Sequence, residues 1–258
     1  MVTLFNHLKF KFMKNTNLLT IIIAFTFITG CRKTVEPQPL STKGTLFFHI
    51  HTFSDTTEFV EGDTVRDASG RQFTYSHARL YISGITLIKL DGTSVPLNNA
   101  YLLVNPDQED YLVGEAPTGN YKSVAFNIGI DSAHNHINPA TYPATNILSY
   151  QTGMHFYSLG EGYTFINVQG KVDSTASMNG PLDKSFSYMV GIDSLLKHVS
   201  MPDEPFSILP GQTQYIHMYA DYSKLFQGIN LKTESDGYEG DAVSQKIANN
   251  ALNIFSLE

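Results

Sequence analysis

The strongest constraint on the fold is a series of short segments in which apolar and polar residues alternate. In residues 45–52, Leu46, Phe48 and Ile50 occupy every second position. A period of two residues is typical of a β-strand, because successive side chains point to opposite faces of a sheet. Turn-forming Pro, Gly, Asn and Asp residues separate most of these segments. Further strands are expected at residues 72–90 (with a bend or bulge at Gly84), 101–104, 121–130, 163–172, 185–190 and 214–220.

Helical patterns are scarce by comparison. Only residues 221–226 and 241–250 have helical character, and the second stretch has apolar residues at helical spacing behind an acidic start. The chain has 258 residues, of which 42% are hydrophobic, and no repeat or linker divides it. The sequence therefore predicts an all-β fold, a single-domain antiparallel β-sandwich with a short C-terminal helix, over residues 45–258. Residues 131–160 lack alternation and are expected to form a long loop, a kind of segment that is often functional.

The N-terminal region has the order of features found in a bacterial lipoprotein signal. Lys14 precedes an uncharged run from Leu18 to Ile28, which is shorter than the roughly 20 apolar residues that span a bilayer. The run ends in Ile-Thr-Gly-Cys31, which resembles a lipobox, and Cys31 is the one cysteine of the chain. The prediction is a signal peptide over residues 1–30 with its true start at Met13, lipidation of Cys31, and a flexible tether over residues 31–44.

The charge balance bears on location and partners. The full chain has a formal charge of −7, and residues 1–30 contain three lysines and no acidic residue, so the mature chain would carry −10. Such a chain is a poor partner for nucleic acid, and lipid rather than surface charge would hold it at a membrane. Arg32 after the cysteine favours outer-membrane sorting by analogy. The expected location is the bacterial cell envelope, at the outer membrane, facing the periplasm or the exterior.

Motifs of known enzyme classes are absent from the sequence. It has no GxSxG elbow, no P-loop and no dinucleotide fingerprint in its strand–helix context. The acidic run of Asp107, Glu109 and Asp110 is expected to be a solvated loop. A metal-dependent hydrolase would need a carboxylate beside histidines, for which Asp131 near His134 is the one candidate. The protein is therefore predicted not to be an enzyme.

Histidines are the side chains that best indicate chemistry. His49 and His51 would lie on one face of a strand, about 7 Å apart along the chain, a spacing that can seat two ligands of one metal. His136 follows His134 in the long loop, and His155 follows a methionine. Imidazole and thioether donors without a thiolate favour copper over magnesium or calcium. His198 and His217 are assigned structural roles, and His77 is left open.

Four stretches occur in an order that resembles one known family. They are RLYISGITLIKLDG (79–92), APTGNYKSVAFNIGIDSAHNH (116–136), GMHFYSLGEGYTFINVQG (153–170) and KIANNALNIF (246–255). They resemble segments of the MbnP-like family of copper-binding proteins, named for partners of methanobactin and common as bacterial lipoproteins. The resemblance implies a secreted all-β sandwich that binds copper through histidines. It makes His136, in the family's Asn-His motif, the first residue to carry over as a ligand.

The chain also departs from the family pattern. Characterised members have an oxidised tryptophan, kynurenine, at or near the metal, made by a partner di-haem peroxidase. This chain contains no tryptophan, so kynurenine cannot form. In the tryptophan positions it has Phe156 and Ser158, or Leu159. Met189 stands where the family tends to have a histidine, and a thioether can ligate Cu(I).

The sequence thus predicts a lipid-anchored, non-catalytic copper-binding protein. Its ligands would be His136 with His49 or His51, supplemented by His155 or Met189. Its partners would be the membrane, through the anchor, and a metal-handling or redox protein. The alternative is a module that binds a peptide, glycan or surface partner without metal. Its recognition surface would be the aromatic residues of the long loop, Tyr142, Tyr150, Phe156 and Tyr157.

Overall fold

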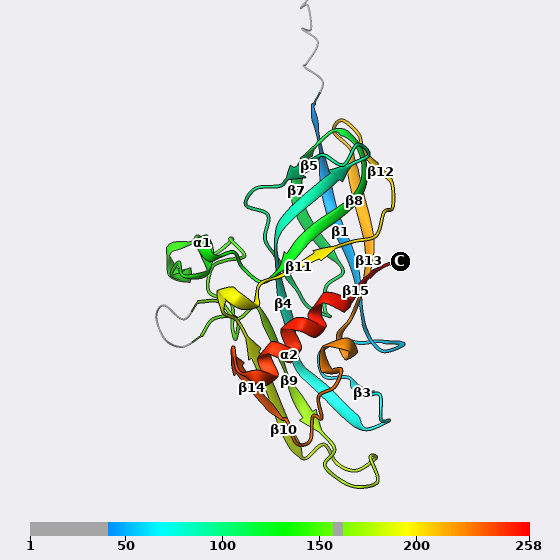
Figure 1. Ribbon diagram of the computed structural model, residues 1–258, viewed down its shortest axis with the longest axis vertical. Coiled ribbons are helices and arrows are strands. Elements are labelled where there is room, and N and C mark those ends of the chain that lie inside the picture. The colour runs from blue at the N-terminus through cyan, green and yellow to red at the C-terminus, as the bar shows by residue number, and fades with distance from the viewer. Residues whose placement is uncertain (1–40, 157–161) are drawn as a thin grey trace, which may run out of the picture. The chain divides into compact units, whose positions relative to one another are not determined.

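The computed structural model describes residues 41–156 and 162–258 (Figure 1). The predicted signal peptide, Cys31 and residues 31–40 of the predicted tether lie outside the described residues, as do Tyr157, Ser158 and Leu159. Leu40–Glu258 form one compact unit. Its first strand, β1 (Lys43–Ser54), begins two residues before the predicted domain start. Within the described part of the chain, no helix has the length and apolar character needed to cross a membrane.

The strands form two sheets. In the smaller sheet β1 is central, and in the larger sheet β4 (Gln72–Lys89) is hydrogen-bonded to strands on both sides. The smaller sheet has the order β15 (Phe255–Leu257), β13 (Thr213–Asp221), β1, β2 (Thr57–Glu58), and β7 (Asp110–Pro117) also pairs with β1. The larger sheet has the order β11 (Lys197–Ser200), β8 (Gly119–Ile128), β4, β9 (Ile166–Val172), β10 (Lys184–Val190), β14 (Asp236–Glu239). In addition, β4 pairs with three short strands, β3 (Thr64–Arg66), β5 (Ser94–Pro96) and β6 (Leu102–Val104), and β8 pairs with β12 (Phe206–Ile208).

The core lies between the two sheets. Phe48 of the smaller sheet meets Phe126 of the larger one with ring centroids 6.0 Å apart, and Phe255 packs against Phe126 at 5.1 Å. Phe48 and Phe126 are completely buried. The predicted all-β sandwich is confirmed. Its sheets are not purely antiparallel, however, because β1 pairs with β13 and β10 with β14 in parallel. These partners are far apart in the sequence, so no short hairpin turn forces them to run in opposite directions.

Gly84 interrupts β4 as the sequence indicates. Its φ is +60°, a left-handed conformation that favours glycine, and a Cβ here would lie 2.5 Å from Asn127 Nδ2. The pairing of β4 with β8 shifts register between Ser83 and Thr86, on either side of this residue. The predicted bulge is therefore present, and the close approach of the Asn127 side chain explains why a larger residue does not fit.

Helical structure is limited to short segments. The C-terminal helix α2 (Ala242–Asn250) is capped by Asp241, whose carboxylate accepts a hydrogen bond from Ser244 N at 2.7 Å, and it buries Ile247. The connection from β8 to β9 carries two one-turn helices, as expected for a long loop. The remaining helical segments are α1 (Ser132–Asn135) and η1 (Pro139–Thr141) in that connection, η2 (Asp193–Leu195), η3 (Tyr222–Phe226) and η4 (Ala251–Asn253).

Replacing Phe48 tests the core between the sheets. Phe48→Ala removes a fully buried ring and should lower the free energy of unfolding by about 3–5 kcal/mol. The measurement is urea unfolding followed by circular dichroism. Leu112→Ala is the matched control, because Leu112 is 57% exposed on β7, and it should cost less than about 0.5 kcal/mol. Equal losses for the two variants would contradict this description of the core.

Candidate metal centre

Strand β1 places two histidines on the outer face of the smaller sheet. The even-numbered Leu46, Phe48 and Ile50 are completely buried in the core, so the odd-numbered residues face outward. The side chains of His49 and His51 are 19% and 25% exposed. Both are therefore partly covered by their neighbours and still open to an ion from solvent.

The two imidazoles converge. Their Nε2 atoms lie 3.1 Å apart, and the rings are almost perpendicular with centroids separated by 4.7 Å. Two nitrogens bound to one ion through bonds of about 2.0–2.1 Å, at angles of about 90–109°, lie about 2.9–3.4 Å apart. The spacing of His49 and His51 is therefore already that of two ligands on a single metal ion.

A carboxylate holds the other nitrogen of each ring. His49 Nδ1 lies 2.7 Å from Asp110 Oδ1, and His51 Nδ1 lies 3.1 Å from Glu58 Oε1. An ionised carboxylate only accepts hydrogen bonds, so in both rings Nδ1 carries the proton and Nε2 presents a lone pair. Metal-binding histidines commonly have this arrangement, in which the carboxylate fixes the ring and increases its basicity.

These hydrogen bonds leave the Nε2 lone pairs of the two rings close to each other. When both imidazoles are neutral, two Nε2 lone pairs face each other at 3.1 Å and repel. A cation between them, either a metal ion or a proton, removes that repulsion. The carboxylates of Glu58 and Asp110 add negative charge around the pair. The charges and lone pairs of this cluster are therefore compatible with a bound positive ion.

Glu109 supplies a third possible ligand. Its Oε2 lies 3.9 Å from His49 Nε2 and its Oε1 lies 3.7 Å from His51 Nδ1. Ile50 N donates to Glu109 O at 2.9 Å, which ties this residue to β1. Among the histidine and acidic side chains of residues 41–156 and 162–258, His49, His51 and Glu109 are the trio whose ligand atoms lie within 4.8 Å of one another. We call these three residues the β1 centre.

The acidic run is exposed, as the sequence indicates, but its position beside β1 was not expected. Glu109 directly precedes β7 and Asp110 begins it, and both carboxylates lie near His49 of β1. The signal in the sequence was the alternation of Tyr111 and Val113, both buried, directly after the acids. That alternation indicates a strand but cannot identify β1 as its partner.

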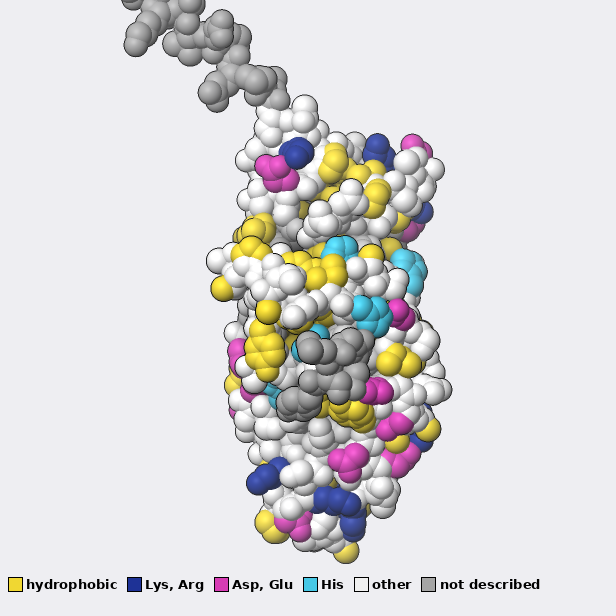
Figure 2. Space-filling model, turned by 90° about the vertical axis from the view of Figure 1, so that its left-hand side faces the viewer, with side chains coloured by type: hydrophobic (Ala, Val, Ile, Leu, Met, Phe, Trp, Pro, Cys, Tyr) yellow, Lys and Arg dark blue, Asp and Glu magenta, His cyan; other side chains and the backbone are white. Residues whose placement is uncertain are grey.

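His136 lies in a different part of the fold. It follows α1 directly, as its C-cap residue. On the face of the molecule that Figure 2 shows, histidine side chains gather at mid-height. Its Nε2 lies 3.2 Å from Asp193 Oδ2. The buried Asn135 donates to Asp193 Oδ1 at 2.7 Å and accepts from Tyr163 N at 2.8 Å. In the described structure the Asn-His motif thus joins α1, η2 and the segment before β9, and it is not part of the β1 centre.

The two supplementary ligand candidates are also outside the β1 centre. His155 Nδ1 donates to Phe156 O at 2.7 Å, and its ring packs against Tyr163 with centroids 5.3 Å apart. Met189 is 9% exposed in β10, where it is paired with Asn167 of β9 and with Tyr238 of β14. Both residues are associated with the larger sheet, whereas the β1 centre lies on the outer face of the smaller one.

Asp131, the carboxylate considered for a hydrolase, is already engaged. Tyr101 OH donates to Asp131 Oδ2 at 2.7 Å, and His134 Nδ1 lies 2.8 Å from Asp131 Oδ1. Burial raises the pKa of the Asp131 carboxyl, but the hydrogen bonds from Tyr101 and His134 outweigh it and bring the pKa below its ordinary value. Burial and the adjacent Asp131 raise the pKa of Tyr101. The three residues form a hydrogen-bonded cluster that positions α1.

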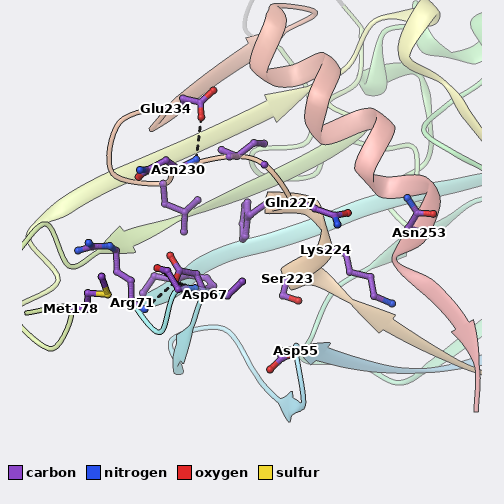
Figure 3. A pocket seen from close by; sticks show the side chains of 17 residues that line it. Asp55, Asp67, Arg71, Met178, Ser223, Lys224, Gln227, Asn230, Glu234 and Asn253 are labelled. Carbon is purple, nitrogen blue, oxygen red and sulfur yellow. Dashed lines mark hydrogen bonds between the residues drawn. The ribbon is translucent and has the colours of Figure 1, made fainter.

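The described aromatic residues of the proposed recognition surface differ in exposure. Tyr150 is 69% exposed, Tyr142 is partly buried against the core and Phe156 is 2% exposed. A cavity of about 1260 Å³ lies where the turn after β3 meets the segment from η3 to β14 (Figure 3). Asp67 and Arg71 line one side of it and Lys224 the other. No histidine lines this cavity, so it is separate from the β1 centre.

The fold and the β1 centre define a class of protein: an all-β sandwich with two histidines and a carboxylate on the outer face of one sheet that could hold a metal ion. The chain belongs to the MbnP family, whose sequence profile matches residues 43–244. The solved structure of MbnP from Methylosinus trichosporium is similar, with a TM-score of 0.50 and 16% identity over 78% of this chain and 82% of that chain. At this identity the similarity shows the fold alone. No curated protein matches the chain.

The hydrogen bonds of Asp193 give a test of the structural role of the Asn-His motif. Asp193→Ala leaves the buried Asn135 Nδ2 without its acceptor and should lower the free energy of unfolding by about 1–3 kcal/mol. Thermal or urea unfolding measures the loss. Asp203→Ala is the control, because Asp203 forms only an exposed ion pair with Lys122 and its loss should cost less than about 1 kcal/mol. An unchanged stability for Asp193→Ala would contradict the structural role.

Proposed function

We propose that this protein binds a copper ion through His49 and His51, with Glu109 as a third ligand, and that it acts outside the cytoplasm without catalysing a reaction. The observation that carries the proposal is the pair of Nε2 atoms at 3.1 Å, each in a ring whose Nδ1 is bound by a carboxylate. Membership of the MbnP family supports a copper-associated role.

The chemistry of the donors is compatible with copper. Imidazole nitrogens suit copper and zinc, and the family relationship favours copper between them. The carboxylate of Glu109 is a harder donor than a thioether and favours Cu(II) at this centre. Since the sequence has no tryptophan, kynurenine cannot contribute, and the histidines and acids must provide the coordination. The residues of the β1 centre would hold and orient the ion, while Asp110 and Glu58 would keep the imidazoles in the ligating tautomer.

The proposed location rests on the sequence. Lipidation of Cys31 after removal of residues 1–30 would tether the sandwich to a membrane of the cell envelope, with the outer membrane favoured by Arg32. The partly exposed histidines are accessible from the outer face of the smaller sheet, so a metal-handling or redox protein could deliver or receive the ion there. A mature chain with a formal charge of −10 also attracts cations to its surface.

Copper affinity of the parent and of a double variant tests the proposal. His49→Ala with His51→Ala should weaken binding by more than about 100-fold, because loss of a supporting group alone already costs about 10–100-fold at metal sites. The measurement is competition with a chelator of known affinity, for Cu(II) and, under reducing conditions, for Cu(I). His198→Ala is the matched control, since His198 is exposed on β11, bonded to Asn127, and should leave binding unchanged.

A variant of His136 tests the Asn-His motif, which the resemblance to the family made the first ligand candidate. His136→Ala should bind copper as tightly as the parent if the β1 centre is the site. If His136→Ala abolishes binding while the double variant binds like the parent, copper is held elsewhere and the proposal is wrong.

The supporting carboxylate and the pH give a second prediction. Asp110→Asn removes the charge that holds His49 Nδ1 and should reduce copper affinity by about 10–100-fold at neutral pH. Copper binds the unprotonated nitrogen of an imidazole, so in the parent the affinity should fall as the pH decreases, because protons compete with the metal. Chelator competition at several pH values measures both effects. Glu115→Gln, on the same strand but paired with Lys43, is the control.

A further inference from the structure

His217 belongs to the same face of the smaller sheet as the histidine pair. In the parallel register of β1 with β13, His217 lies directly opposite His49. Its neighbours Ile216 and Met218 are buried, so the His217 side chain projects outward beside the His49 ring. No sequence pattern places these histidines together, because β13 (Thr213–Asp221) lies far along the chain from β1.

The separation of the two rings fits a shared ion. The centroids of His49 and His217 are 5.0 Å apart, close to the 4.7 Å between His49 and His51. Two imidazoles bound to one ion have centroids about 4.5–5.3 Å apart, given a bond of about 2.05 Å and about 1.1 Å from nitrogen to ring centre. The distance between the His49 and His217 rings is therefore suitable for a shared ion. His217 is not among the residues whose ligand atoms lie within 4.8 Å of one another, so its ring would have to turn to point a nitrogen at that ion.

His217 also has the carboxylate arrangement seen in the other two histidines. Its Nδ1 lies 3.1 Å from Glu258 Oε2, in a position set by the pairing of β13 with β15. With Nδ1 bound to the carboxylate, Nε2 carries the lone pair, as in His49 and His51. The His217 side chain is 54% exposed and can turn toward His49 without disturbing the core.

We infer that His217 is a further ligand of the β1 centre, which turns toward the ion once His49 and His51 hold it. This inference rests on the proposed function. Three imidazoles and the Glu109 carboxylate then surround the ion, a nitrogen- and oxygen-rich set that suits Cu(II). In the structure each of the three rings has its own carboxylate, Asp110 for His49, Glu58 for His51 and Glu258 for His217.

The number of nitrogen ligands distinguishes a two-histidine from a three-histidine centre. We would load the parent, His217→Ala and His198→Ala proteins with one equivalent of Cu(II) and count coordinated imidazoles by pulsed electron paramagnetic resonance. The parent and His198→Ala should show three, and His217→Ala should show two. His217→Ala should also lower Cu(II) affinity by about 10-fold or more in chelator competition. Because His217 is half exposed, the variant should retain the parent's thermal unfolding midpoint.

The outcomes separate this inference from the proposed function. If the parent binds Cu(II) and the His49/His51 double variant does not, but His217→Ala matches the parent in nitrogen count and affinity, the inference is overturned and the proposed function stands. If the parent shows two imidazoles from the outset, His217 is not a ligand. If the double variant binds like the parent, the β1 centre is not the copper site and both proposals fail.

Discussion

The register of β1 against its neighbours is the constraint on which the rest of the structure depends. One face of this strand fills the core with Leu46, Phe48 and Ile50, and the other presents His49 and His51. A shift of one residue would bury both imidazoles and expose the apolar side chains, so burial fixes the register strongly. The same register sets His49 opposite Asp110 of β7 and opposite His217 of β13. The register that packs the core therefore also brings the residues of the β1 centre together.

The electrostatics of the centre follow from that arrangement. Histidines that touch carboxylates through Nδ1 have their Nε2 lone pairs directed away from those carboxylates, and here two such lone pairs meet at 3.1 Å. Without a cation this contact is repulsive, while the acidic residues around it lower the energy of any positive ion. An acidic protein whose histidines are concentrated in this way has a physical reason to bind a metal that needs no thiolate.

The family's aromatic signature has a different role in this chain. Phe156, in one of the positions where the resemblance implies tryptophan, is 2% exposed and packs against Tyr238 with centroids 5.1 Å apart. Asn135 and Asp193 connect the adjoining segments through hydrogen bonds. The described part of this region therefore preserves the fold, with apolar packing and buried polar contacts, and the strongest arrangement of metal donors lies on the opposite sheet.

The sequence by itself determined the longer strands other than β7, the break at Gly84, the capped C-terminal helix and the family, because each depends on local periodicity or on motifs in a fixed order. It also determined that His49 and His51 share a face, since that follows from a two-residue period. Only the tertiary structure decided which residues surround them. Asp110 and His217 belong to strands far from β1 in the sequence, and Glu109 directly precedes one of them. The choice of strand partner depends on the packing of the whole core. For the same reason the sequence alone could not show that Glu109, Asp110 and His217 lie beside the histidines of β1.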